Sequence, residues 1–206
     1  MAGRRLTREQ RRAQLLDTAL AIVREEGADV LTLARVAEEA GVSKPVAYEH
    51  FATRTGLLTA LYRRIDQQQT EAATAALDTQ AHSLAETARV LTEAYVDCVL
   101  HIGKEFGTVT AALSSIAGTE SLLREGRERY AELYLRALER FVPLPKGEGM
   151  PLMLGVIGAT EALAREVIEH RLGRTEAVAV ASRIMLGAVT GPEEQGVNTS
   201  PLDRSA

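Results

Sequence analysis

The sequence has little cysteine and few aromatic residues, and it lacks the apolar runs that define a membrane protein. Its 206 residues include one cysteine, no tryptophan and 4% aromatic residues. A single cysteine, Cys98, excludes an intramolecular disulfide and fits a reducing cytoplasm. No apolar run approaches the length of a membrane-spanning helix. Residues 15–23 are apolar, but Asp17 interrupts them and no small-residue cleavage site follows, so a secretory signal is not expected.

Motifs of the common enzyme classes are also missing from the sequence. We find no HExxH, GxSxG, CxxC or GxGxxG motif and no phosphate-binding Walker loop. His82, His101 and His170 share no spacing typical of metal ligands. Cys98 has no neighbouring base that would activate its thiol, and a small buried apolar role suits it better. We therefore expect no catalytic residues, no metal site and no cofactor.

The residues that are abundant favour helix. Hydrophobic residues make up 46% of the chain, which is enough to bury a core in one or two domains. Alanine, leucine, glutamate and arginine dominate, and all four are good helix formers. Alternating runs of valine, isoleucine and threonine, which are typical of strands, are rare. The composition therefore predicts an all-α fold.

The stretch Thr32–Phe51 predicts two short helices joined by a tight turn. Thr32 is a good N-cap, because its hydroxyl can accept a hydrogen bond from an unpaired backbone N–H. Gly41 favours the left-handed conformation that ends a helix. Ser43 suits the next N-cap, and Pro45 falls in a first turn, where its missing N–H costs nothing. The pattern is typical of a DNA-binding helix-turn-helix, although an ordinary helical corner shares part of it.

The residues that follow the turn are more specific. The segment Lys44–Phe51, with Arg54, Leu57 and Leu58 after it, resembles the signature of the tetracycline-repressor (TetR) family of bacterial transcription regulators. The resemblance covers about Leu15–Tyr62, and beyond that range it rests on chain length and helix pattern alone. It implies a helix-turn-helix domain that binds double-stranded DNA.

The charge distribution agrees with DNA binding at one end of the chain. The net charge is −4, but residues 1–64 hold eleven Lys and Arg against eight Asp and Glu, a balance of +3, whereas residues 65–206 carry −7. Local positive charge is what phosphate contacts require. Five arginines crowd the beginning of the chain: Arg4, Arg5, Arg8, Arg11 and Arg12. This arm can contact DNA or can serve only as a solvated segment.

The pattern and the resemblance together predict two domains and a tail. Residues 1–52 should form a three-helix DNA-binding domain that begins with a helix from Thr7 to Glu26, with a capping box at its start. Residues 53–190 should form a helical domain for effector binding and dimerisation. Residues 191–206 are rich in Gly, Pro, Glu, Asn and Ser and are expected to be disordered.

Several helices are expected in the second domain. Thr53 can cap the first of them. Thr55-Gly56 departs from the resemblance, since it stands where the family usually has an acidic residue, and Gly56 should weaken that first turn. Gly103 and Gly107 are expected to bracket a break between two helices. A further helix should run from about residue 122 to residue 141, before a loop that contains Pro143.

The last two predicted helices differ from the others. Residues 151–172 and 175–189 are apolar on more than one side and carry many small residues, so they must be covered nearly all round. They are either central core helices or a surface that packs against a second copy of the chain. The resemblance implies the second arrangement, since TetR proteins typically dimerise through their last two helices. A two-fold axis also suits a palindromic DNA site.

Candidate DNA-binding residues follow from charge and position. Charged and hydroxyl-bearing side chains would contact phosphates, which fix register without reading sequence. The resemblance places two apolar residues of the second helix in the groove, where they can contact thymine methyl groups. The predicted DNA-binding residues are Thr32, Lys44, Pro45, Val46, Tyr48, His50 and Arg54.

The resemblance also implies a cavity in the second domain for a small effector molecule, whose binding changes the separation of the two recognition helices. The candidate lining is mainly apolar with hydroxyl tips, which favours a hydrophobic ligand. Each candidate suits the plain core equally well. The candidates are Leu91, Tyr95, Cys98, Phe106, Thr110, Tyr130, Tyr134 and Glu161.

Three functions are compatible with the sequence. The first is a ligand-responsive homodimeric regulator, with repression as the family's usual mode. The second is a regulator of the same fold without a small-molecule inducer. The third is a helical-bundle enzyme or structural module with an incidental helix-turn-helix, which would need a converging polar cluster that we do not find. We favour them in that order, with no membrane partner expected.

Overall fold

The structure is a computed structural model that describes residues 6–144 and 147–190, apart from the side chains of residues 101–104. Over these residues it contains helices and no strand, which confirms the predicted all-α class. Predictions for Arg4, Arg5, His101 as a side chain, and the tail 191–206 lie outside the described part. The helices are α1 (Arg8–Glu26), α2 (Leu33–Glu39), α3 (Lys44–Phe51), α4 (Arg54–Gln80), α5 (Leu84–Ser114), α6 (Glu120–Glu139), α7 (Gly149–Ile168) and α8 (Arg174–Thr190).

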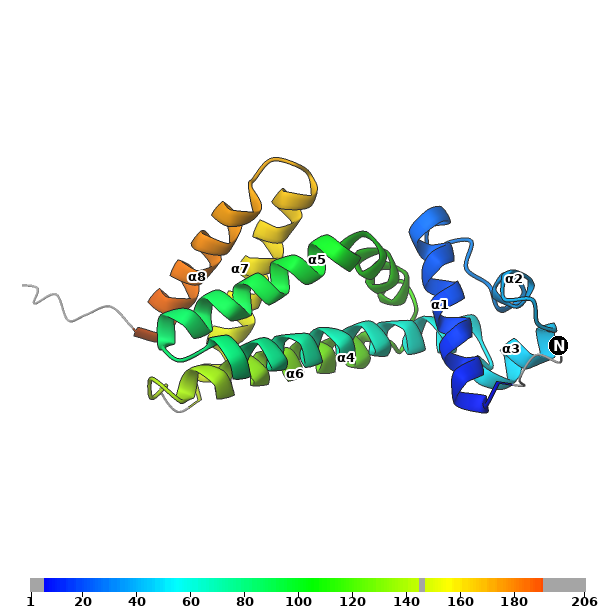
Figure 1. The fold of residues 1–206 in the computed structure, drawn as a ribbon, viewed down its shortest axis with the longest axis horizontal. Coiled ribbons are helices and arrows are strands. Elements are labelled where there is room, and N and C mark those ends of the chain that lie inside the picture. Colours follow the sequence, from blue (N-terminus) through cyan, green and yellow to red (C-terminus); the bar gives the residue numbers. More distant parts are fainter. Residues whose placement is uncertain (1–5, 145–146, 191–206) are drawn as a thin grey trace, which may run out of the picture.

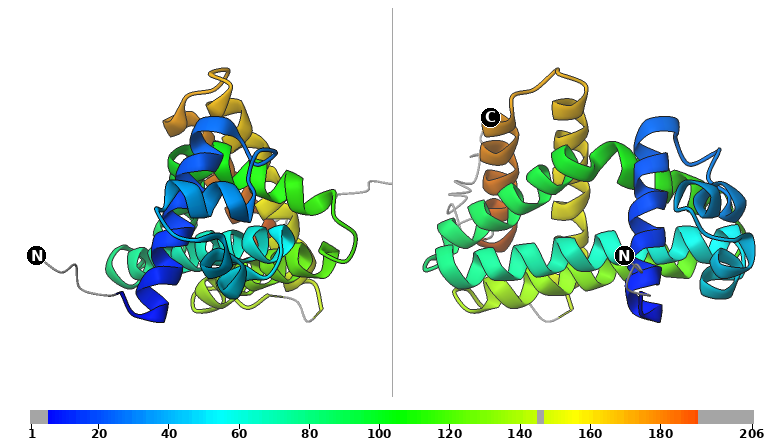
Figure 2. Two further views of the ribbon diagram at one scale, coloured as in Figure 1. Left: turned by 90° about the vertical axis from the view of Figure 1, so that its right-hand side faces the viewer. Right: turned by 45° about the vertical axis from the view of Figure 1, so that its right-hand side comes forward.

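The helices form a long molecule with the helix-turn-helix at one end. Helices α1–α3 cluster there, and α4 leads from them along the length of the molecule beside α5 and α6 (Figure 1). Helices α7 and α8 pack against each other and against α5 at the opposite end, as the further views in Figure 2 show. Within the described ranges, no helix is both long enough and apolar enough to cross a membrane.

Helix α1 begins and ends as the sequence predicts. The Thr7 hydroxyl accepts a hydrogen bond from the Gln10 backbone N–H at 3.2 Å, and the Gln10 side chain accepts one from the Thr7 N–H at 3.0 Å. This reciprocal pair is a capping box. Gly27 ends the helix at a φ of 90°. The apolar stripe of α1 is buried in the N-terminal core, where α1 packs against α2, α4 and α5.

Helix α4 connects the two parts of the molecule. Its first turns supply Leu57, Leu58 and Tyr62 to the core of the N-terminal helices, and Val109 of α5 joins the same core. The core of the N-terminal domain therefore extends past the loop at residue 52, where we expected the domain to end. An ion pair also joins α4 to α1, because Arg64 donates to the Asp17 carboxylate at 2.5 Å.

Helix α5 corrects one prediction. It runs from Leu84 to Ser114 without interruption, so the expected break between Gly103 and Gly107 is wrong. Glycine inside a helix costs only about 1 kcal/mol relative to alanine. The turns beyond Gly107 bury Val109 and Leu113 completely in the N-terminal core. That burial contributes roughly 1.5–3 kcal/mol per side chain, which exceeds the cost of the glycines.

The structure shows why a glycine occupies position 56, which the sequence did not reveal. A Cβ atom at this position in the first turn of α4 would lie 2.2 Å from the carbonyl oxygen of Phe51. The close approach arises because Ala52 turns the chain at a φ of 58°, directly after α3. Thr53 caps α4 as predicted, since its hydroxyl accepts from the Gly56 N–H at 3.0 Å. The residue that should weaken the helix start therefore permits the tight joint between α3 and α4.

Candidate DNA-binding site and effector cavity

Helices α2 and α3 form the predicted helix-turn-helix. The Thr32 hydroxyl accepts from the Arg35 N–H at 3.1 Å and caps α2. Gly41 has a φ of 65°, and the next N–H, that of Val42, donates to the Ala37 carbonyl at 2.9 Å. This bond closes the turn between the helices. Ser43 occupies the N-cap of α3, but its side chain makes no capping hydrogen bond, so the expected cap is present in position only.

Helix α3 has one buried face and one exposed face. Ala47 and Phe51 are buried in the N-terminal core. Lys44, Pro45 and Tyr48 lie on the exposed face, and the Tyr48 side chain is 51% exposed. A large aromatic side chain that remains exposed on a short helix is available to a partner. The structure thus places the predicted contact residues Lys44, Pro45 and Tyr48 together on one accessible surface.

Helix α1 supports α3 and adds positive charge beside it. The Arg12 guanidinium lies 4.8 Å from the centre of the Phe51 ring and donates to the His50 carbonyl at 3.3 Å. Burial lowers the pKa of the half-buried His50 imidazole, and the nearby guanidinium groups of Arg8, Arg12 and Arg11 lower it further, while Glu49 opposes this. His50 is therefore a neutral hydrogen-bond donor or acceptor at pH 7. Arg8 and Arg11 lie close enough to α3 to contribute to a common positive surface.

Arg54 does not occupy the place that we predicted for it. Its guanidinium donates to the backbone carbonyl of Leu31 at 2.9 Å and to that of Ala28 at 2.7 Å. Both carbonyls belong to the loop that connects α1 to α2. The planar guanidinium suits two such acceptors at once. Arg54 therefore fixes the start of α4 to this loop, and we remove it from the proposed phosphate contacts.

Substitution of Arg54 tests this structural role. We expect Arg54→Ala to lower the free energy of unfolding by about 2–3 kcal/mol, because two partly buried carbonyls lose charged donors. Arg54→Lys keeps the charge but cannot donate to both carbonyls as the planar guanidinium does. We therefore expect it to lower the free energy of unfolding by most of the amount expected for Arg54→Ala. Chemical denaturation monitored by circular dichroism measures both variants. A phosphate-contact role would instead leave stability unchanged and let the lysine variant retain DNA affinity.

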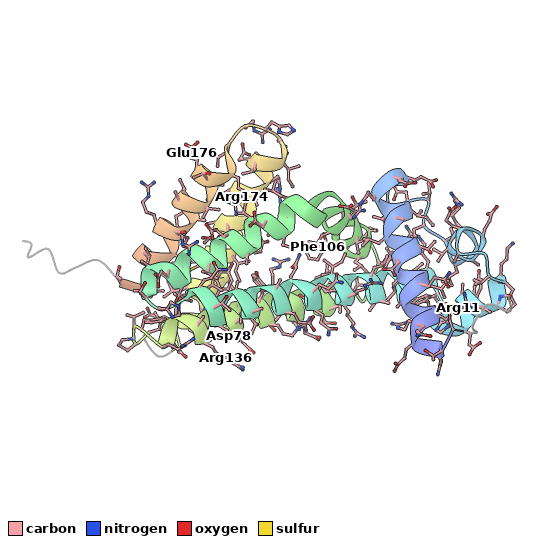
Figure 3. The ribbon with its side chains drawn as sticks, in the orientation of Figure 1. Arg11, Asp78, Phe106, Arg136, Arg174 and Glu176 are labelled. Carbon is pink, nitrogen blue, oxygen red and sulfur yellow. The ribbon has the colours of Figure 1, made fainter. Side chains whose placement is uncertain are left out.

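A cavity lies between α4, α5, α6 and α7. It comprises a space of about 370 Å³ and an adjoining space of about 60 Å³. Five residues line both spaces: Tyr62, Tyr95, Val99, Phe106 and Arg127. Phe106 lies between α5 and α4 (Figure 3) and stacks on Tyr62 with ring centres 5.7 Å apart. The volume is within the range of small-molecule sites.

Most of the predicted effector residues meet at this cavity. Its lining includes Tyr95, Cys98, Phe106, Thr110, Tyr130 and Glu161. Leu91 and Tyr134 are fully buried, and the Tyr134 hydroxyl donates to the Leu91 carbonyl at 3.1 Å. The structure therefore places these two residues in the packed core rather than in the cavity wall. Of the two roles that the sequence left open for Tyr134, the structure favours the core, because a backbone carbonyl of α5 accepts the hydrogen bond of its hydroxyl.

The wall of the cavity is apolar but carries uncharged hydrogen-bonding groups. Burial raises the pKa of Tyr62 to about 12 and raises the pKa values of Tyr95 and Tyr130 further. Burial also raises the pKa of the Cys98 thiol to about 11. These side chains are neutral at pH 7, so the thiol is not an activated nucleophile. The arrangement of these neutral side chains suits binding of a ligand.

Several lining residues were missed in the sequence. Tyr62 and Arg127 line the cavity, but neither was among the predicted lining residues. Tyr62 approaches α6 so closely that a Cβ atom on Gly126 would lie 1.8 Å from its hydroxyl oxygen. The Gly126-Arg127 pair was therefore a possible signal, because glycine in the middle of a helix often marks a close approach.

Known proteins resemble both the sequence and the fold. Residues 15–61 match the sequence profile of the bacterial regulatory proteins, tetR family. The chain is 33% identical over 99 residues to the HTH-type transcriptional activator FasR of Mycolicibacterium smegmatis. This alignment covers 48% of this chain and 45% of FasR. It is also 37% identical over 81 residues to the HTH-type transcriptional regulator BetI of Cronobacter sakazakii. That alignment covers 39% of this chain and 40% of BetI. The matches thus span less than half the length of these relatives.

The fold comparison extends over nearly the whole chain. A crystal structure of a TetR-like transcriptional regulator from Rhodococcus superimposes with a TM-score of 0.69 at 24% identity, covering 91% of this chain and all of that chain. The helix-turn-helix, with α3 exposed on a supporting α1, has the arrangement of a DNA-binding domain. Residues 15–61 thus resemble the N-terminal domain of TetR-family regulators, and over the rest of the chain the likeness is one of fold.

Proposed function

We propose that the protein is a homodimeric, ligand-responsive repressor that binds a palindromic operator in the cytoplasm and releases it when a small, largely hydrophobic molecule binds. The observation that carries the proposal is the exposed face of α3, where Lys44, Pro45 and Tyr48 lie free of the core. Helix α1 adds arginines beside it. Cationic and hydroxyl groups at the start of a recognition helix are suited to the phosphates that flank a major groove.

Each residue of this surface has a proposed role. Lys44 contacts a phosphate by charge, and the Tyr48 hydroxyl donates to a phosphate oxygen. The hydroxyl oxygen of Thr32 accepts the capping hydrogen bond of α2, so the hydroxyl proton remains free to be donated to a DNA phosphate. Pro45 and Val46 contact base edges in the groove, where apolar side chains recognise the thymine methyl group. The neutral His50 supplies a further hydrogen bond.

The outer face of α7 and α8 supports the proposed dimer. Leu154 and Ile184 are 36% and 41% exposed although both are large and apolar. A Cβ atom on Gly155, Gly158 or Gly187 would meet no atom of the described residues within 4 Å, so no packing among those residues requires a glycine at these positions. A groove of about 420 Å³ runs between the two helices. An apolar face with small residues lets the same helices of a second copy approach closely.

A charge on this face should dissociate the dimer. We expect Ile184→Glu to raise the dimer dissociation constant by roughly hundredfold or more, because the two-fold axis buries two unpaired carboxylates. Analytical ultracentrifugation measures the change, and operator affinity should fall with it. Val30→Glu is the matched control, since Val30 is 42% exposed in the loop between α1 and α2. Equal dimerisation by both variants would argue against an α7–α8 interface.

The proposed response to a ligand is supported by the position of Tyr62. This residue belongs to the core of the N-terminal helices and also lines the cavity. A ligand that displaces its stacking partner Phe106 would therefore act directly on α4, whose start is fixed to the α1–α2 loop by Arg54. Two states of α4 with different ligand affinity would couple the cavity to the DNA surface.

The sign of regulation is tested with a promoter reporter, which distinguishes repression from activation. The relative FasR is named an activator.

A further inference from the structure

The arginines of α6 differ in whether an acidic side chain pairs with them. Arg124 and Arg136 each pair with a glutamate four residues away, Glu128 and Glu132 respectively. Arg129 donates to the Asp66 carboxylate of α4 at 2.7 Å. Arg127 has no acidic residue three or four positions away on the helix. Among the described residues, no ion pair or hydrogen bond of its side chain is found.

Arg127 is also the arginine that lines both spaces of the cavity. The other charged groups of the lining have partners, because Asp66 accepts from Arg129 and Glu161 accepts from Arg165 at 3.3 Å. The aromatic rings of Tyr62, Tyr95 and Phe106 lie in the same wall. The cavity thus combines an apolar, aromatic wall with one cation, Arg127, for which the described residues provide no ion-pair partner. A charged group at the edge of an apolar pocket fixes the orientation of a ligand.

We propose that the effector is an amphipathic organic anion, with Arg127 as the anchor for its carboxylate or sulfonate and with the aromatic wall around its apolar body. The inference rests on the proposed function, because it specifies the ligand of the same cavity. A guanidinium forms paired, charge-assisted hydrogen bonds with such an anionic group. An anion in the cavity would balance Arg127 and press on the stacked rings of Phe106 and Tyr62, which contact the N-terminal core.

A matched pair of fluorescent probes tests the anchor. Anilinonaphthalenesulfonate is an aromatic anion, and phenylnaphthylamine has the same aromatic body without the sulfonate. We expect the wild-type protein to bind the anion at least tenfold more tightly than the neutral probe. Arg127→Gln should remove this preference by weakening binding of the anion about tenfold and leaving the neutral probe unchanged, since a charged hydrogen bond is lost. Fluorescence titration measures both affinities.

Two variants locate the effect. Arg136→Gln removes the same charge from the end of α6 away from α1 (Figure 3) and should change neither affinity. Thr110→Trp fills the cavity and should abolish binding of both probes. The inference is overturned if Arg127→Gln binds the anion as tightly as the wild type, if Arg136→Gln weakens it equally, or if Thr110→Trp leaves binding intact. Operator binding is measured in parallel, and its absence in the wild type would instead count against the proposed function.

Discussion

Replacement of both Lys44 and Tyr48 by alanine is expected to weaken operator binding about hundredfold without loss of the fold. Each side chain would supply one contact to a phosphate, and hydrogen bonds to charged groups contribute about 1.5 kcal/mol each. Both side chains lie on the exposed face of α3, so their removal leaves no cavity in the core. Fluorescence anisotropy on operator DNA measures the affinity, and circular dichroism measures helicity and thermal unfolding.

Single variants separate the contributions. Tyr48→Phe removes only the hydroxyl and should lose most of the Tyr48 effect. Lys44→Ala should reduce the dependence of the logarithm of affinity on the logarithm of salt concentration by about one, because one fewer counterion is displaced. Arg136→Ala is the charge-matched control at the far end of α6 and should bind as the wild type does. Equal losses in Lys44→Ala and Arg136→Ala would indicate an effect of overall charge rather than a contact.

The second large effect is expected at Gly56. Alanine is the better helix former by about 1 kcal/mol, so helix propensity alone predicts that Gly56→Ala stabilises the protein. The structure predicts the opposite sign, because the new Cβ atom would overlap the Phe51 carbonyl oxygen at 2.2 Å. Overlap with backbone costs more than the propensity gain, and we expect a net loss of about 2 kcal/mol. Thermal unfolding should then shift downwards by about 4–8 °C.

Gly107 provides the control for this prediction. It lies inside α5, and a Cβ atom there would meet no atom within 4 Å among the part of the chain that the structure describes. Gly107→Ala should therefore stabilise the protein by about 0.5–1 kcal/mol, as propensity predicts. If Gly56→Ala also raised the unfolding temperature, the tight joint between α3 and α4 would not exist in the form described.

The local features of the fold could be predicted because neighbouring residues determine them. The capping box of Thr7 and Gln10, the turn at Gly41 and the first-turn Pro45 depend on residues within one helical turn, and the structure contains all of them. The exposed position of Tyr48 followed from the shortness of α3. The helix break near Gly103 was wrongly predicted because distant burial of Leu113 offsets local glycine propensity.

Roles that depend on distant partners could not be predicted. Arg54 looked like a phosphate contact because its partners, the carbonyls of Ala28 and Leu31, carry no mark in the sequence. The sequence could not decide between the core and the cavity for Tyr134 for the same reason, since its acceptor is a backbone group of another helix. Arg127 could have been found, because the sequence alone shows that no acidic residue lies three or four positions from it on the helix.

Selection of DNA fragments by the purified full-length protein is the most direct test of a dimeric, operator-specific regulator. Fragments of genomic DNA are enriched over several rounds and sequenced, and the best site is titrated at two salt concentrations. We predict one enriched palindrome, bound by one dimer with an affinity that falls steeply as salt increases. Weak binding that is equal on all fragments, with no enriched palindrome, would contradict operator recognition by α3 and leave the cavity domain to explain the function.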